Sequence, residues 1–130
     1  MKYLCLIHAE RTYEDLPEGE QVPLVHEYRR LTADLRESGQ YLGSHRLLPP
    51  ATATTVRVRN GRLSITDGPF AETKEQLAGY YLIEARDLNE AIQVAARIPT
   101  ARHGAVEVRP VAGDVRLPGE PEPAAAAAGA

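Results

Sequence analysis

The sequence is poor in several residues on which common kinds of protein depend. Its 130 residues include one cysteine, one phenylalanine and no tryptophan. The single cysteine, Cys5, cannot form a disulfide within the chain, and its place in an apolar stretch predicts a small buried side chain rather than a nucleophile. This scarcity excludes an internally disulfide-bonded scaffold.

The chain also lacks an excess of basic residues and a long apolar run. It has 15 Lys and Arg against 18 Asp and Glu, a formal net charge of −3, which gives no electrostatic footprint for nucleic acid or an anionic membrane. No stretch approaches the roughly 20 apolar residues that span a bilayer, and the amino terminus lacks a signal-peptide pattern. We therefore expect a cytoplasmic protein that binds neither nucleic acid nor membrane.

Common catalytic and metal-binding motifs are absent as well. The sequence has no G-x-S-x-G, P-loop, H-E-x-x-H or paired C-x-x-C pattern. Its four histidines show no close ligand spacing, so a metal site would have to be assembled by folding: His8, His26, His45 and His103. We expect neither a metal nor a cofactor.

What is present is a strand and helix, followed by a second strand. Lys2–His8 is apolar on both faces, which predicts a central strand. After a polar loop over Ala9–Gln21, Pro23 suits the first turn of a helix that Gly39 ends. The buried stripe of that helix is formed by Leu24, Tyr28, Leu31 and Leu35, and His26 lies opposite it. Tyr41–Leu48 is the second predicted strand.

A β-hairpin is the best local signal in the sequence. Asn60 and Gly61 accept the positive φ of a type I′ turn. Closing the hairpin there pairs Val58 with Leu63 and Val56 with Ile65 on one face. The opposite face then carries Arg57, Arg59 and Arg62, which we interpret as edge protection rather than a ligand clamp.

The last third of the chain repeats the strand and helix. Thr73 and Gln76 suggest a brief helical turn, and Gly79–Ala85 is a predicted strand. Asp87 then caps a helix that Pro99 ends. The apolar stripe of that helix is formed by Leu88, Ala91, Ile92, Ala95 and Ile98. Val106 and Val108 mark a final strand that closes at Pro110 or Val111.

The order of elements, βαβ-ββ-βαβ, predicts an α+β, ferredoxin-like fold whose antiparallel-containing sheet has two helices on one face. We expect Lys2–His8 and Gly79–Ala85 to be parallel central strands, which brings His8 near Glu84. The uncovered face carries Leu4, Leu6, Tyr80 and Leu82, which favours a homodimer. Residues 1–111 form the domain, and residues 112–130 form a flexible tail rich in proline and alanine.

The densest group of turn-forming and charged residues begins at Asp67. Asp67, Gly68 and Pro69 predict a tight turn, and Phe70 is expected to be its buried apolar anchor. The string DGPFAETKE, followed by GYYLIEA, DLNEA and GAVEVRPV, resembles the DGPF-domain branch of the YCII-related proteins over Met1 to about Val111.

That resemblance implies a ferredoxin-like fold of the dimeric α/β-barrel type. It transfers only the residues of the motif: Asp67, Gly68, Pro69, Phe70, Glu72, Lys74 and Glu75. Some YCII-related proteins resemble lyases or hydrolases that use a histidine and aspartate pair, with the histidine at the start of the first helix. The matching position here is Tyr28, so that pair is not carried over.

Two classes of function follow. The first is a cofactor-free enzyme that moves a proton on a small polar or anionic metabolite, with His8 as acid or base, Asp67 or Glu84 as its carboxylate, and Arg109 as an anion clamp. The other residues assigned to the substrate are Phe70, Glu72, Lys74, Glu75 and Tyr80. The second is a non-catalytic binding or regulatory module, for example a partner of an alternative sigma factor. In that case His8 is a strand-end histidine bonded to backbone.

Overall fold

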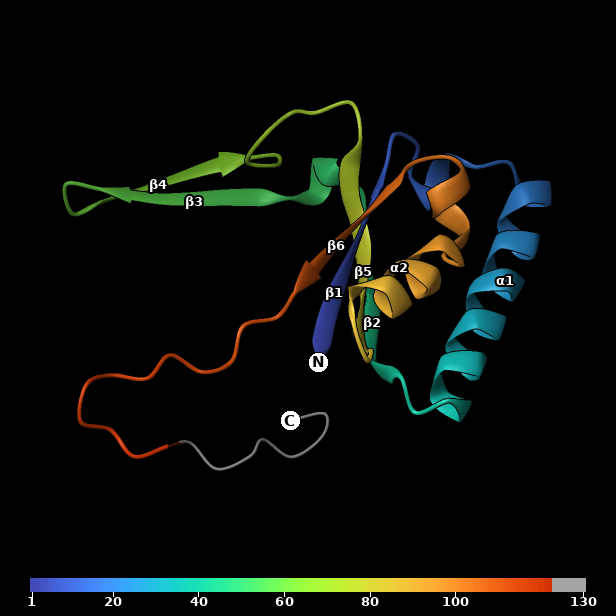
Figure 1. Ribbon diagram of the computed structural model, residues 1–130. Coiled ribbons are helices and arrows are strands. Elements are labelled where there is room, and N and C mark those ends of the chain that lie inside the picture. Colours follow the sequence, from blue (N-terminus) through green and yellow to red (C-terminus); the bar gives the residue numbers. More distant parts are fainter. Residues whose placement is uncertain (123–130) are drawn as a thin grey trace.

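The computed structural model describes residues 1–122 and contains a four-stranded sheet with two helices on one face (Figure 1). The strand order is β2-β5-β1-β6, and β3 and β4 form a separate two-stranded hairpin. The strands are β1 (Lys2–Ala9), β2 (Tyr41–Arg46), β3 (Thr54–Arg59), β4 (Arg62–Asp67), β5 (Gln76–Glu84) and β6 (Ala105–Pro110). The helices are α1 (Glu18–Glu37) and α2 (Leu88–Ala96).

This topology is the ferredoxin-like α+β fold, as predicted, but the central strands do not run as expected. β1 pairs with β5 antiparallel, with Lys2 opposite Glu84 and Ala9 opposite Gln76. Each βαβ unit leaves a gap between its two strands, and a strand of the other unit fills it in the opposite direction. The prediction of parallel central strands is therefore wrong. Glu84 on β5 lies beside Lys2, at the opposite end of β1 from His8.

The core lies between the sheet and the helices. β1 contributes Tyr3, Cys5 and Ile7, which alternate with half-buried residues as the period of a strand requires. Leu35 of α1 and Ile83 of β5 are both fully buried. The helix-covered face of the sheet is thus a packed interior.

Helix α1 begins earlier than the sequence suggests. Pro17 precedes its first residue, so Pro23 lies inside the helix rather than in its first turn. Proline there removes one backbone hydrogen bond. Glu18 and Glu20 lie in the first turn, where their negative charges stabilise the helix by interacting with the positive end of its dipole. The Nε2 amide of Gln21 donates to the carbonyls of Tyr13 and Leu16. The loop before α1 is therefore tied to the helix.

Helix α2 begins as predicted and faces the sheet with a slightly different stripe. The Asp87 carboxylate accepts a hydrogen bond of 2.9 Å from the Glu90 N–H. The helix ends at Ala96, before Pro99, and Leu88 and Ile92 are about half exposed at 49% and 50%. Placing these two in the buried stripe was wrong, because Val94 turns toward the sheet in their place.

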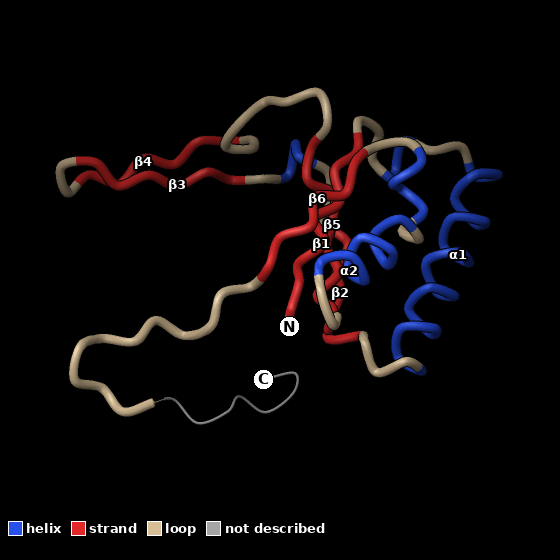
Figure 2. Tube along the Cα trace, viewed as in Figure 1, coloured by secondary structure: helices blue, strands red, loops and turns tan. Residues whose placement is uncertain are grey.

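The β3–β4 hairpin has the predicted turn and register. Asn60 and Gly61 have φ of 52° and 72°, and the apolar pairs are Val58 with Leu63 and Val56 with Ile65. The hairpin extends from the top of the sheet on the side away from the helices (Figures 1 and 2). Its apolar face is open, since these four side chains are 58–63% exposed.

Segments outside the regular elements complete the chain. The predicted helical turn at Thr73 and Gln76 does not form, because Gln76 starts β5 and its side chain donates to the carbonyls of Ala71 and Thr73. Residues 111–122 form no helix or strand, and the rest of the predicted tail, 123–130, lies outside the described residues. Across residues 1–122, neither helix is long and apolar enough to cross a membrane.

Candidate functional site

The face of the sheet opposite the helices carries most of the predicted site residues. Leu4, Leu6 and His8 alternate with the core residues of β1 and point to this uncovered face. Their register partners on β6 are Arg109, Glu107 and Ala105, respectively. His8 and Arg109 therefore share the uncovered face, as the alternation predicts.

His8 is the least satisfied polar residue on that face. Its side chain is 29% exposed, but its Nε2 atom is buried and, within residues 1–122, accepts or donates no hydrogen bond. The nearest carboxylate oxygen is Oε1 of Glu107, 3.7 Å away. Glu107 also pairs with the Arg109 guanidinium. Because a buried polar atom without a hydrogen bond costs about 1–3 kcal/mol, a small movement that lets this nitrogen bond to Glu107 or to a ligand would be favourable.

The backbone around His8 is irregular. Ile7 faces Gly79 but His8 faces Leu77, so Ala78 is an extra residue that forms a β-bulge. Such bulges change the direction of neighbouring side chains and are frequent next to functional sites. On the other side, a Cβ at Gly104 would lie 2.1 Å from the His8 carbonyl oxygen. His8 is thus held by a bulge and by a close backbone contact that only glycine allows.

Two residues of the DGPF string reach the His8 end of the sheet. Nζ of Lys74 lies 4.0 Å from a carboxylate oxygen of Glu10, just after β1. The Glu75 carboxylate lies near Gly104, 3.2 Å from where a Cβ would be. Lys74 and Glu75 therefore border the site on the side of β1 and β6.

The start of the string lies elsewhere, at the base of the hairpin. Asp67 is exposed and pairs in register with Thr54. The turn is held by two hydrogen bonds to β3 and the residue before it: Gly68 N–H donates to the Ala53 carbonyl, and the Thr55 hydroxyl donates to the Gly68 carbonyl. Glu72 is exposed as well.

Phe70 does not anchor the turn, so that prediction is wrong. It is 76% exposed and lies beneath the Arg57 guanidinium, whose carbon is 5.2 Å from the ring centroid. Pro69 is the residue that lines an apolar hollow of about 340 Å³ at the hairpin base, together with Leu47, Leu48, Pro49, Pro50, Thr52, Ala53, Gln76 and Leu77. Leu77 is also the register partner of His8. The hollow therefore adjoins the His8 end of the sheet.

Tyr80 and Glu84 occupy the middle and the far end of the uncovered face. The Tyr80 hydroxyl lies 2.8 Å from Nδ1 of His45 on β2. Glu84 accepts a hydrogen bond of 2.6 Å from the terminal ammonium group of Met1. Glu84 thus has a structural partner far from His8.

Other titratable groups are explained by packing. Burial raises the pKa of the Cys5 thiol from 9.0 to about 11, which makes it a poor nucleophile. Burial also raises the pKa values of Tyr28 and Tyr81, whose hydroxyls lie 2.6 Å and 2.8 Å from those of Thr100 and Thr32. His26 is exposed, as predicted.

The loop before α1 is fixed against β2. A hydrogen bond from Arg46 lowers the pKa of Glu14, and the Arg46 guanidinium lies over the Tyr13 ring at 4.9 Å. These contacts tie the segment between β1 and α1 to the end of β2 that is nearest the hollow.

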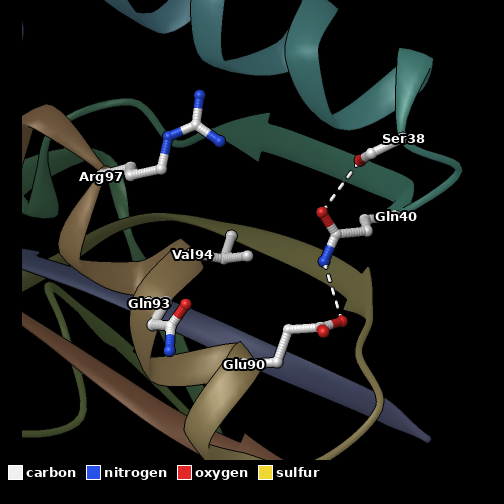
Figure 3. Close-up of a pocket in the computed structure, with 6 residues that line it drawn as sticks. All are labelled: Ser38, Gln40, Glu90, Gln93, Val94 and Arg97. Carbon is white, nitrogen blue, oxygen red and sulfur yellow. Dashed lines mark hydrogen bonds between the residues drawn. The ribbon is translucent and has the colours of Figure 1, made fainter.

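A second hollow, of about 440 Å³, lies on the helix side of the molecule (Figure 3). Ser38 donates to Gln40, and Gln40 donates to Glu90, at 2.9 Å and 3.2 Å. Arg97 at its rim pairs with Asp34 at 2.6 Å. These polar groups bind one another and join α1 to α2, so we interpret this hollow as structural.

Sequence reasoning missed three contributors to the site: Leu77, Gly104 and Glu107. Glu107 alternates with Val106 and Val108 on β6, but the sequence alone does not link it to His8. Once β6 is paired with β1, His8 faces Ala105, and Glu107 lies two residues further along β6 on the same face of the sheet. That register is the signal that would have linked the two residues. Among the described residues, no group of three His, Cys, Asp or Glu side chains is arranged to hold a metal ion.

Comparison with known proteins identifies the family of this chain. The family model for the YCII-related domain matches residues 1–113. An uncharacterized protein of Rhizobium meliloti (strain 1021), R00369, is 44% identical over 86 residues, which are 65% of this chain and 68% of that protein. The match to the family model covers all the strands and helices described above. The chain therefore belongs to the YCII-related family.

Proposed function

We propose that the protein binds a small anionic metabolite at the His8 end of the uncovered face and that His8 exchanges a proton with it. The observation that carries this proposal is the buried Nε2 atom of His8, which makes no hydrogen bond and lies 3.7 Å from a carboxylate oxygen of Glu107. A histidine beside a carboxylate is the minimal arrangement for general acid and base catalysis. No cofactor is needed for that chemistry.

The neighbouring groups suit such a ligand. Glu107 lies between the His8 ring and the Arg109 guanidinium, which supplies positive charge at the surface. The apolar hollow at Leu77 and Pro69 offers space for a carbon skeleton. A mostly apolar recess with few polar groups is typical of small-molecule sites. In this proposal Glu107 is the carboxylate beside His8, in place of Asp67 or Glu84, and it faces the same ring nitrogen as the ligand.

The proposal includes a homodimer. Leu4, Leu6, Tyr80 and Leu82 are half-buried and form the apolar centre of the uncovered face. Covering this surface with a second copy removes it from water and encloses the His8 end. Light scattering on the intact chain tests the assembly: a dimer is expected, and a monomer at 100 μM, about the upper range for a specific contact, contradicts it.

The binding site is tested by NMR titration of the ¹⁵N-labelled protein with three probes: malonate, hexanoate and inorganic phosphate. We expect saturable shifts at His8, Glu107 and Arg109 for at least one probe. Arg109→Gln should weaken that binding about tenfold, as for loss of one charge-assisted contact. The matched control is Arg29→Gln, an exposed arginine of α1 on the helix side of the sheet, which should leave that binding unchanged. Shifts confined to the hairpin arginines contradict the proposed site.

Proton transfer needs a separate measurement. Pyruvate in D₂O offers an exchangeable methyl group next to a carbonyl, whose deuteration an acid and base pair accelerates. We expect faster deuteration with the wild type than with His8→Gln. If the two proteins deuterate pyruvate at equal rates while both bind one of the three probes above, the site is a binding site without catalysis. That result favours the regulatory module, the second candidate, which the exposed apolar hairpin also suits.

A further inference from the structure

We propose that the β3–β4 hairpin is an arm whose apolar face packs against a second copy of this chain. The four side chains on that face, Val56, Val58, Leu63 and Ile65, are 58%, 59%, 63% and 63% exposed. Within the described residues they belong to a hairpin paired only with itself. An isolated two-stranded hairpin is marginally stable in water, so this one needs a covering surface.

The position of the hairpin indicates what covers it. It extends on the same side of the sheet as the uncovered face, opposite both helices (Figures 1 and 2). One body placed against the uncovered face therefore meets the hairpin as well. The hairpin and the uncovered sheet face thus border the same space, and one partner can contact both.

The area required favours a second copy. A stable interface covers about 800 Å² on each partner, more than four side chains of a hairpin supply. The hairpin and the uncovered sheet face are thus needed together. A second copy related by a two-fold axis offers both surfaces in return, which is the self-complementary arrangement of symmetric dimers.

Charge favours the same partner. The hairpin, Thr54–Asp67, carries three arginines and one aspartate, a net charge of +2. Because the whole chain carries −3, the remainder carries −5. A basic arm is therefore attracted to the acidic body of another copy. The arginines Arg57, Arg59 and Arg62 lie on the other face of the hairpin, so they attract the partner from outside the apolar contact.

This inference extends the proposed homodimer, and one experiment separates the two. The full-length chain is compared with Leu63→Lys on the apolar face and with Thr66→Lys on the opposite face of the same strand. Sedimentation over a dilution series gives the dimer dissociation constant. We expect Leu63→Lys to raise it at least about tenfold, because each copy buries one lysine, and Thr66→Lys to change it by less than about twofold.

A third variant, Leu6→Lys, places the same charge on the sheet face. If Leu6→Lys dissociates the dimer and Leu63→Lys does not, the sheet-face dimer stands and the arm is overturned. A wild type that stays monomeric overturns both. Circular dichroism checks each fold, and Leu63→Thr, which keeps a strand-favouring side chain, replaces Leu63→Lys if the latter misfolds. Leu63→Thr should raise the dissociation constant in the same direction, and an unchanged constant overturns the arm.

Discussion

The two faces of the β2-β5-β1-β6 sheet have different surroundings. On the helix side, Cys5, Leu35 and Ile83 have no exposed surface. On the other side, Leu4, Leu6 and Tyr80 are half-buried, and the Nε2 atom of His8 has no hydrogen-bond partner among residues 1–122. The first face is explained by the fold of one chain. The second face is left uncovered by that chain, and this is where we propose the ligand and the second copy.

The largest contrast should appear in unfolding free energy. Ile83→Ala removes a fully buried side chain from the helix face and should cost about 2–5 kcal/mol. Leu63→Ala removes a side chain that is 63% exposed and, in dilute solution where the chain is monomeric, should cost less than about 0.5 kcal/mol. Urea unfolding measures both. Equal costs would show that the hairpin is packed within one chain.

The buried thiol gives a pH-dependent version of the same contrast. The unfolded chain loses the Cys5 proton near pH 9.0, whereas the folded chain keeps it to about pH 11. The contribution of the protonated thiol to the free energy of unfolding is therefore fully present below pH 9. It is lost between pH 9 and 11, by about 3 kcal/mol at about 1.36 kcal/mol per unit of pKa. Urea unfolding of the wild type and Cys5→Ala at pH 8, 10 and 11 tests this.

The control in that series is internal. Tyr28 and Tyr81 also have raised pKa values, but they are present in both proteins. The difference between the two pH profiles therefore isolates Cys5. Parallel profiles would contradict the assignment of the alkaline loss to the buried thiol.

The smallest effect is expected at the most distinctive residue of the DGPF string. Phe70 is 76% exposed, so Phe70→Ala should change the free energy of unfolding by less than about 0.5 kcal/mol. Pro69→Ala, which alters the lining of the hollow, is the comparison within the same turn. A loss of several kcal/mol for Phe70→Ala in the dilute protein would restore Phe70 as a buried anchor.

Local patterns in the sequence predicted most of the fold. The turn at Asn60 and Gly61, the cap at Asp87 and the two faces of β1 depend on neighbouring residues, and all three are confirmed. The direction of β5 relative to β1 depends on how two βαβ units fit together, which no local pattern specifies. The start of α1 was missed because proline was treated as a first-turn residue, although a helix tolerates it further in at a cost.

The site was harder to predict than the fold for the same reason. The sequence identified His8 and Arg109 as candidate site residues. The carboxylate beside His8 depends on the register of β6 and on the bulge at Ala78, which are long-range features. Asp67 was chosen because it opens the DGPF string, and Glu84 was chosen because the central strands were assumed to be parallel. In the structure, Glu84 instead binds the terminal ammonium group of Met1.

Amide hydrogen exchange tests most directly whether the uncovered side of the molecule is completed by a second copy. Exchange is followed in peptides from the hairpin, residues 54–67, and from β5, residues 76–84, at 1 μM and 100 μM, which bracket a dissociation constant of about 10 μM. We expect hairpin amides to exchange at least about tenfold more slowly at the higher concentration, because local stability there depends on the partner. The β5 amides, which pair on both sides within one chain, should remain protected at both. Hairpin exchange that is independent of concentration, while light scattering reports a dimer, would contradict the account.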